Sequence, residues 1–136
     1  MILYSDHIIQ LDYIPDDDVL VTSLQEERDY NADDVRSAFR SIAAYIKEYN
    51  ISRLLLDFRR NTLDLAIGEY KFTVAQLTVG LLQTSLQRVA RVGTDDPKRE
   101  NKIQTMYEEI KAAVPIPIAV RMFPSWQEAY DWLTEE

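Results

Sequence analysis

One stretch decides the fold: Ile51-Ser52-Arg53-Leu54-Leu55-Leu56-Asp57-Phe58-Arg59-Arg60. Its three leucines follow one another without polar alternation, so we expect both faces of this strand to be covered, as in the centre of a parallel sheet. Charged residues then gather at the end of the strand, from Asp57 to Arg60. The stretch therefore predicts a central strand with polar chemistry at its carboxyl end.

The chain before this strand predicts a hairpin and a crossover helix. Residues His7 to Leu24 alternate apolar and polar side chains on both sides of Pro15-Asp16-Asp17-Asp18. Pro and Asp favour a turn, which we expect to be solvated, because the acids lack the spacing of a calcium loop. Asn31 then caps an amphipathic helix that ends at Asn50. Such a helix connects parallel strands.

The segment from Asn61 to Leu82 is the hardest to interpret. In its first part apolar and polar residues alternate, which favours an extended segment or an irregular loop. The residues from Tyr70 to Leu81 fit a helical stripe, and Gly68 and Gly80 would lie at the two ends of that helix. The helix carries several β-branched residues of low helix propensity, so tertiary burial must hold it. The segment is either packed core or a movable lid over a pocket.

The remaining chain alternates strands and helices. Leu86 to Val92 predicts a strand, Asp96 and Pro97 predict the start of a helix, and Ile118 to Met122 predicts a further strand. Ser125 opens a short last helix with a capping box. We therefore predict an α/β fold, with a mixed, mostly parallel sheet, an N-terminal β-hairpin and about four helices.

Composition limits the class of protein. The 136 residues fit a single domain, 1–136, with 46% hydrophobic and 28% charged residues and no cysteine. The net charge of -8 argues against binding nucleic acid. No apolar run reaches the ~20 residues of a membrane span, and no signal peptide precedes the hairpin, so we expect a cytoplasmic protein without stable membrane insertion.

Three predicted strand ends meet at one edge of the sheet, where open α/β sheets bind ligands. They are the segments from Asp57 to Thr62, from Gly93 to Asp96 and from Phe123 to Trp126. Arginines and helix N-termini there could capture an anion or a small ligand. The alternative is purely structural: Asp57 pairs with a neighbouring arginine, and the caps serve only their helices.

Enzymatic chemistry has little support in the sequence. A magnesium site built from Asp57, Asp64, Asp95 and Asp96 would lack the paired acids and the lysine of receiver domains. Nucleophilic catalysis lacks a positioned base, because the only histidine is His7. We expect no metal and no cofactor, and an acid-dependent enzyme is the weakest hypothesis.

The order of elements, together with the ending Phe123-Pro-Ser125-Trp-Gln-Glu128-Ala129-Tyr-Asp-Trp132-Leu133, resembles the STAS superfamily, and within it the SpoIIAA-like (STAS/SEC14-like) branch of small bacterial proteins. The resemblance implies a non-enzymatic regulatory or binding module. In the related anti-sigma-factor antagonists, a serine in a D-S-[ST]-G motif after the central strand is phosphorylated. Here Asp64 is followed by Leu65, so the resemblance does not carry the phosphorylation switch to this chain.

The first functional hypothesis is therefore a STAS-like module that binds a protein or a small ligand. The alternative is a SEC14-like carrier or sensor of a small apolar ligand. Trp132, Tyr130 and the hairpin leave apolar area without an identified cover, which is compatible with a homodimer. The predicted ligand- or partner-binding residues are Asp57, Arg59, Arg60, Thr62, Asp64, Thr94, Asp95 and Ser125.

Overall fold

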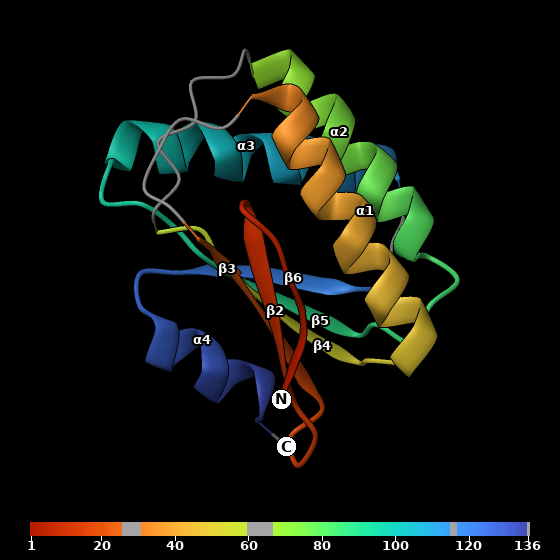
Figure 1. Ribbon diagram of the computed structural model, residues 1–136. Helices are drawn as coiled ribbons and strands as arrows, with labels where there is room; N and C mark the ends of the chain where they lie inside the picture. The colour runs from red at the N-terminus through yellow and green to blue at the C-terminus, as the bar shows by residue number, and fades with distance from the viewer. Residues whose placement is uncertain (26–30, 60–66, 115–116, 136) are drawn as a thin grey trace.

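A computed structural model describes residues 1–25, 31–59, 67–114 and 117–135 of the chain. This part forms six strands and four helices (Figure 1). Their bounds are β1 (Ile2–Ser5), β2 (Ile9–Ile14), β3 (Val19–Leu24), α1 (Ala32–Tyr49), β4 (Arg53–Asp57), α2 (Ile67–Leu81), β5 (Arg88–Val92), α3 (Pro97–Ala113), β6 (Ala119–Phe123) and α4 (Trp126–Leu133).

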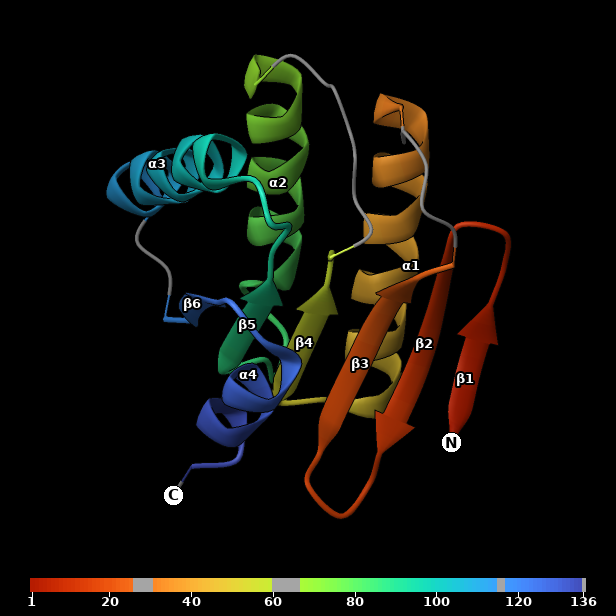
Figure 2. The same ribbon diagram turned by 90° about the vertical axis from the view of Figure 1, so that its left-hand side faces the viewer.

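The strands form one sheet in the order of the sequence, from β1 to β6 (Figure 2). β2 pairs antiparallel with β1 and with β3, and the pairs from β3 to β6 are parallel. This confirms the mixed α/β fold. The strand β1 was not predicted: it extends the hairpin to three antiparallel strands, and the amino group of Met1 fixes it by bonding the Asp12 carboxylate at 2.8 Å.

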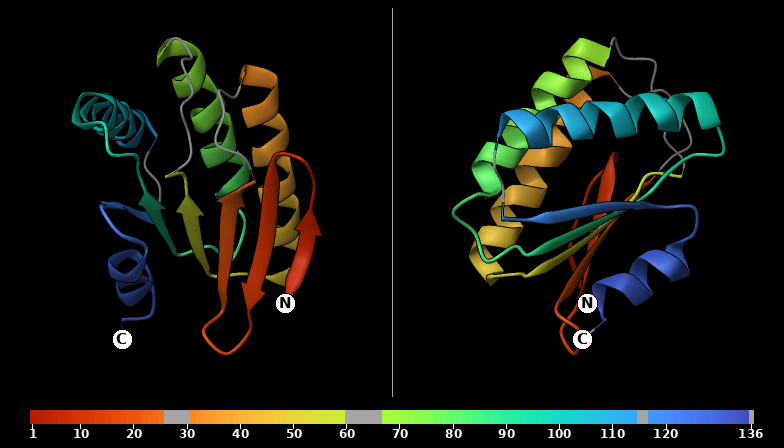
Figure 3. Two further views of the ribbon diagram at one scale, coloured as in Figure 1. Left: turned by 60° about the vertical axis from the view of Figure 1, so that its left-hand side comes forward. Right: turned by 180° about the vertical axis from the view of Figure 1, so that it is seen from behind.

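The central strand β4 is buried on both faces, as its three leucines predict. Leu54 and Leu56 belong to the larger core, and Leu55 belongs to a second, smaller core. Because side chains alternate along a strand, the two cores lie on opposite faces of the sheet. α1, α2 and α3 cover the face of the larger core, and α4 covers the other (Figures 1 and 3).

The single helix α4 covers only part of its face. It contacts β4, β5 and β6, and its residues Ala129 and Leu133 complete the smaller core. On this side of the sheet no helix of the described chain lies over β1 and β2 (Figure 2). A polar half-face is left open there, and it holds the candidate site.

The helix ends confirm most predicted caps. Asn31 caps α1 together with Asp34, Asn50 ends it in a left-handed conformation, and Asp96 caps α3 ahead of Pro97. The prediction for α2 was wrong at its ends: Ile67 is helical, and Gly68 and Gly80 lie within the helix rather than outside it. Neither glycine stops the helix, because it continues one residue past Gly80 and packs Leu81 into the core.

The turn between β2 and β3 is less solvated than predicted. The carboxylate of Asp18 accepts hydrogen bonds from the Tyr13 hydroxyl at 2.7 Å and from Ser52. The neighbouring Asp17 accepts one from the hydroxyl of Tyr130 on α4. The bonds of Ser52 and Tyr130 tie the turn to the start of β4 and to α4. The hydrogen bond to Asp18, together with burial, raises the pKa of Tyr13 to about 12.

Candidate functional site

The open half-face carries a row of polar side chains that strand register places side by side. Ser5 pairs with Gln10, Gln10 with Ser23, and Ser23 with Asp57. Beyond Asp57 the same row becomes apolar at Val92. The change from polar to apolar falls between β4 and β5, where Val92 joins the smaller core under α4.

A pocket of about 460 Å³ lies over this row, at the carboxyl ends of β3 and β4. Its lining residues come from three strands and the segments that follow them: Gln10, Ser23, Leu24, Gln25, Asp57 and Arg59. Leu24 is the one apolar side chain among them. The lining thus offers hydrogen-bond donors and acceptors rather than an apolar cavity.

An ion pair forms one wall of the pocket. Arg59 Nε lies 2.8 Å from Asp57 Oδ1, and Arg59 Nη2 lies 2.7 Å from Asp57 Oδ2, a bidentate arrangement. Hydrogen bonding to Asp57 raises the pKa of Arg59, against the opposing effect of its partial burial. The Arg59 side chain is 53% exposed and that of Asp57 only 14%. The strand end thus holds the acid in place and presents the guanidinium outward.

The opposite wall is fixed by bonds of Gln25. Its side-chain nitrogen donates to Ser5 Oγ at 2.8 Å, and its backbone N–H donates to the carbonyl of Ile8. Bonds within the chain therefore hold these described parts of the lining in place.

A second polar cluster lies on the other face, under α3. Arg91 on β5 is fully buried and donates to the Glu100 carboxylate, and its guanidinium lies 5.8 Å from the ring centroid of Phe58. Thr94 Oγ1 donates to Glu100 Oε2 at 2.9 Å. Burial by itself raises the pKa of Glu100, but the bonds from Arg91 and Thr94 outweigh it, so the pKa lies below its ordinary value. The cluster fixes the turn between β5 and α3.

The predicted site residues do not form one cleft in the described chain. Asp57 and Arg59 line the pocket, whereas Thr94 bonds Glu100 on the other face. Asp95 is exposed in its turn. Ser125 accepts from the N–H of Glu128 and caps α4. The remaining predicted residues, Arg60, Thr62 and Asp64, lie outside the described residues.

For Asp57, Asp96 and Ser125 the geometry favours the purely structural role, in which these side chains pair with a neighbouring arginine or cap their own helices. The Asp57 carboxylate is occupied by Arg59, and the side chains of Asp96 and Ser125 accept bonds from their own helices. Within the described residues, no three acidic or histidine side chains gather as a metal site would require. Of the four acids considered for magnesium, Asp64 lies outside this part of the chain.

Sequence reasoning missed the pocket residues of β2 and β3. Gln10 and Ser23 come together through antiparallel register, which their spacing in sequence does not reveal. It also missed the pair of Arg91 and Glu100. A signal was present there, because Arg91 is the one charged residue in the buried run from Val89 to Val92. A charge within such a run requires a buried partner.

Comparison with known proteins supports the architecture. A family model described as SpoIIAA-like matches residues 23–134, from the end of β3 to the end of α4. No curated protein and no solved structure gives a match. Within the described residues, no helix has the length and apolar character needed to cross a membrane. The matched region contains β4, β5, β6, the last two residues of β3 and all four described helices, and the chain belongs to the SpoIIAA-like family.

Proposed function

We propose that this chain is a non-enzymatic STAS-type module that binds another protein through the polar pocket at the ends of β3 and β4. The observation that carries the proposal is the pocket itself, with its polar described lining. It lies on the side of the sheet where α4 leaves β1 and β2 uncovered (Figure 2). Its walls combine the outward guanidinium of Arg59 with the neutral side chains of Gln10 and Ser23. Such groups suit recognition of a polar segment on a protein surface.

A non-enzymatic role is supported by the positions of the acids with displaced pKa values. Among the residues that the structure describes, Asp6 and Glu100 are the carboxylic acids with a lowered pKa, and structural hydrogen bonds contribute to each. Asp6 closes the turn before β2 by accepting from the N–H groups of Ile8 and Ile9, whereas Glu100 lies on α3. An acid-base mechanism needs two tuned groups in one cleft, and these two do not line the pocket.

The apolar-ligand carrier receives less support. It requires a cavity beneath α2, but Val74 and Leu81, the buried apolar residues of the described α2 side chains, are packed in the larger core. The pocket at β3 and β4 lies elsewhere and is mainly polar. Part of the segment proposed as a lid, residues 61–66, falls outside the described chain.

Affinity capture from extract of the native cells tests the proposal. Wild-type protein is compared with Ser23→Arg, which places a long charged side chain in the pocket, and with Arg59→Ala. Ser37→Arg is the matched control, because Ser37 is exposed on α1, on the other side of the sheet. We expect a protein that wild type and Ser37→Arg both retain and that Ser23→Arg loses. Equal retention by all variants would contradict a role for the pocket.

A further inference from the structure

From Phe72 onward, the helix α2 exposes an uncharged surface in a strongly charged protein. From Phe72 to Gln87 the sequence holds no charged residue, although 28% of the chain is charged. Within α2, Phe72 is 62% exposed and Val79 is 56% exposed. Uncharged helical surface with exposed apolar side chains is typical of a surface that another molecule covers.

The exposed residues of α2 form a stripe with a protrusion and a notch. Phe72, Gln76 and Gly80 are all exposed and follow one another at four-residue spacing, so they lie along one side of the helix. Phe72 is a large ring at one end. A Cβ built on Gly80 meets no atom within 4 Å, so the other end is open. Residues 72 and 80 are about 12 Å apart along the axis of the helix.

This stripe is complementary to itself. In an antiparallel pair of α2 helices with Gln76 on the two-fold axis, residue 72 of one copy lies opposite residue 80 of the other. The Phe72 ring then fills the open space over the partner copy's glycine, twice by symmetry. We propose that the chain forms a homodimer through α2, with Gln76 at the axis, Phe72 as the anchor and Gly80 as its receptor.

The lack of charge on this part of α2 allows the partner to be a second copy. Two chains of net charge -8 repel each other overall, and from Phe72 onward α2 adds no charge to the contact. A carboxamide carries both a donor and an acceptor, so two Gln76 side chains can bond each other across the axis. One helix on each copy falls short of the ~1,200 Å² of a stable interface, so the dimer is weak and concentration-dependent.

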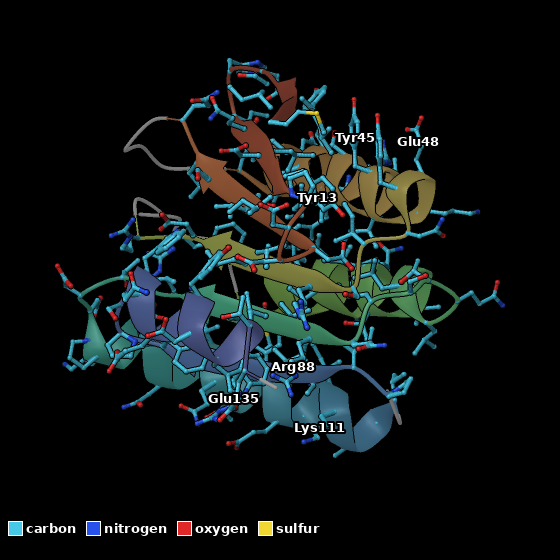
Figure 4. All side chains as sticks on the ribbon, turned by 90° about the horizontal axis from the view of Figure 1, so that it is seen from below. Tyr13, Tyr45, Glu48, Arg88, Lys111 and Glu135 are labelled. Atoms are coloured by element: carbon cyan, nitrogen blue, oxygen red, sulfur yellow. The ribbon has the colours of Figure 1, made fainter. Side chains whose placement is uncertain are left out.

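The aromatic rings that first suggested a dimer are engaged within the chain. Trp132 lies between Arg88 and Arg121, with the two guanidinium carbons 5.3 and 5.6 Å from its ring centroid. Arg88 also donates hydrogen bonds to the backbone carbonyls of Trp132 and Glu135 (Figure 4). Tyr130 stacks on Trp126, with ring centroids 4.9 Å apart. These contacts engage both rings within the chain, whereas Phe72 and Val79 of α2 are among the large hydrophobic side chains that stay exposed.

Charged substitutions of Gln76, the residue at the two-fold axis, test the proposal. Gln76→Glu and Gln76→Lys each place two like charges together in a homodimer, and each should raise the dissociation constant of the dimer by about tenfold or more. A mixture of the two variants should restore association, because opposite charges then meet. Gly80→Leu should also weaken the dimer by filling the notch, although leucine favours the helix and thus preserves the fold.

Sedimentation equilibrium of the full chain, from low to high micromolar concentration, gives the readout. Gln127→Glu and Gln127→Lys on α4, exposed on the opposite side of the sheet, are the matched controls and should associate like wild type. A wild type that stays monomeric throughout overturns the proposal, as does a mixture that fails to restore association. Binding of an apolar fluorescent probe to monomeric wild type, lost in Gln76→Glu, would assign the stripe to a ligand and also overturn it.

Discussion

The guanidinium of Arg91, fully buried beneath α3, donates a hydrogen bond to the carboxylate of Glu100. The pair joins β5 to the first turn of α3, and the turn between them passes directly beneath the carboxylate. Because a buried charge without a partner is costly, the pair should determine whether this end of the sheet stays ordered.

Glu100→Gln should lower the free energy of unfolding by about 3 kcal/mol, because it removes the negative charge that the buried guanidinium of Arg91 contacts. Urea denaturation followed by circular dichroism measures the change. Glu108→Gln is the control on the same helix, since Glu108 is exposed, and it should change stability by less than about 0.5 kcal/mol. Equal effects of the two substitutions would contradict the assigned role of the pair.

The same pair predicts how stability depends on pH. The pKa of Glu100 in the folded chain lies below its ordinary value of 4.5, so folding favours the ionised form. Its contribution is therefore fully present above the ordinary pKa and is lost as the pH falls through the lower, folded value. Between pH 6 and strong acid, wild type should lose more unfolding free energy than Glu100→Gln. Parallel pH profiles would show that the pair is not linked to folding.

Two glycine substitutions should have opposite effects. A Cβ on Gly93 would overlap the Glu100 carboxylate and lie 2.9 Å from Arg91 Nη1, so Gly93→Ala should destabilise the fold by about 2 kcal/mol. Gly80→Ala meets open space on a helix and should stabilise it by about 0.5 kcal/mol. Thermal unfolding at low micromolar protein concentration compares the two. The same sign of change in both variants would be inconsistent with this geometry.

A buried hydroxyl offers a stabilising substitution. Thr22 is fully buried between Leu11 and Leu56, and its Oγ1 has no hydrogen-bond partner in the described structure. Thr22→Val removes this unsatisfied group while keeping the side-chain shape, and it should raise the free energy of unfolding by about 1 kcal/mol. The contrasting variant is Thr94→Val, which loses the bond to Glu100 and should cost about 1.5 kcal/mol. Destabilisation by Thr22→Val would show that the Thr22 hydroxyl makes a stabilising interaction in the folded chain.

Most of the architecture could be predicted because it rests on local signals. The buried run of leucines in β4 and the caps Asn31, Asp96 and Ser125 act within a few residues of themselves. The strand β1 could not be predicted in this way. Its four residues are too few for a pattern, and its place is fixed by β2 and by the bond from the amino terminus to Asp12.

The candidate site could be predicted only in part. Asp57 and Arg59 were found because a charged end to a buried strand is visible in sequence. The other pocket residues depend on strand register and on which strands α4 covers, and both are properties of the assembled sheet. The predicted cleft therefore lay toward β5 and β6, whereas the pocket lies toward β2 and β3.

If the polar pocket binds another protein, a reactive group in its wall should lie against that protein in the cell. The most direct test replaces Gln10, in the pocket wall, with a photo-crosslinking amino acid and irradiates the native cells. The same replacement at Gln127, exposed on α4, is the control. A covalent adduct with a discrete protein should form at position 10 and be absent at position 127. No adduct at position 10, or the same adducts at both positions, would contradict protein binding by the pocket.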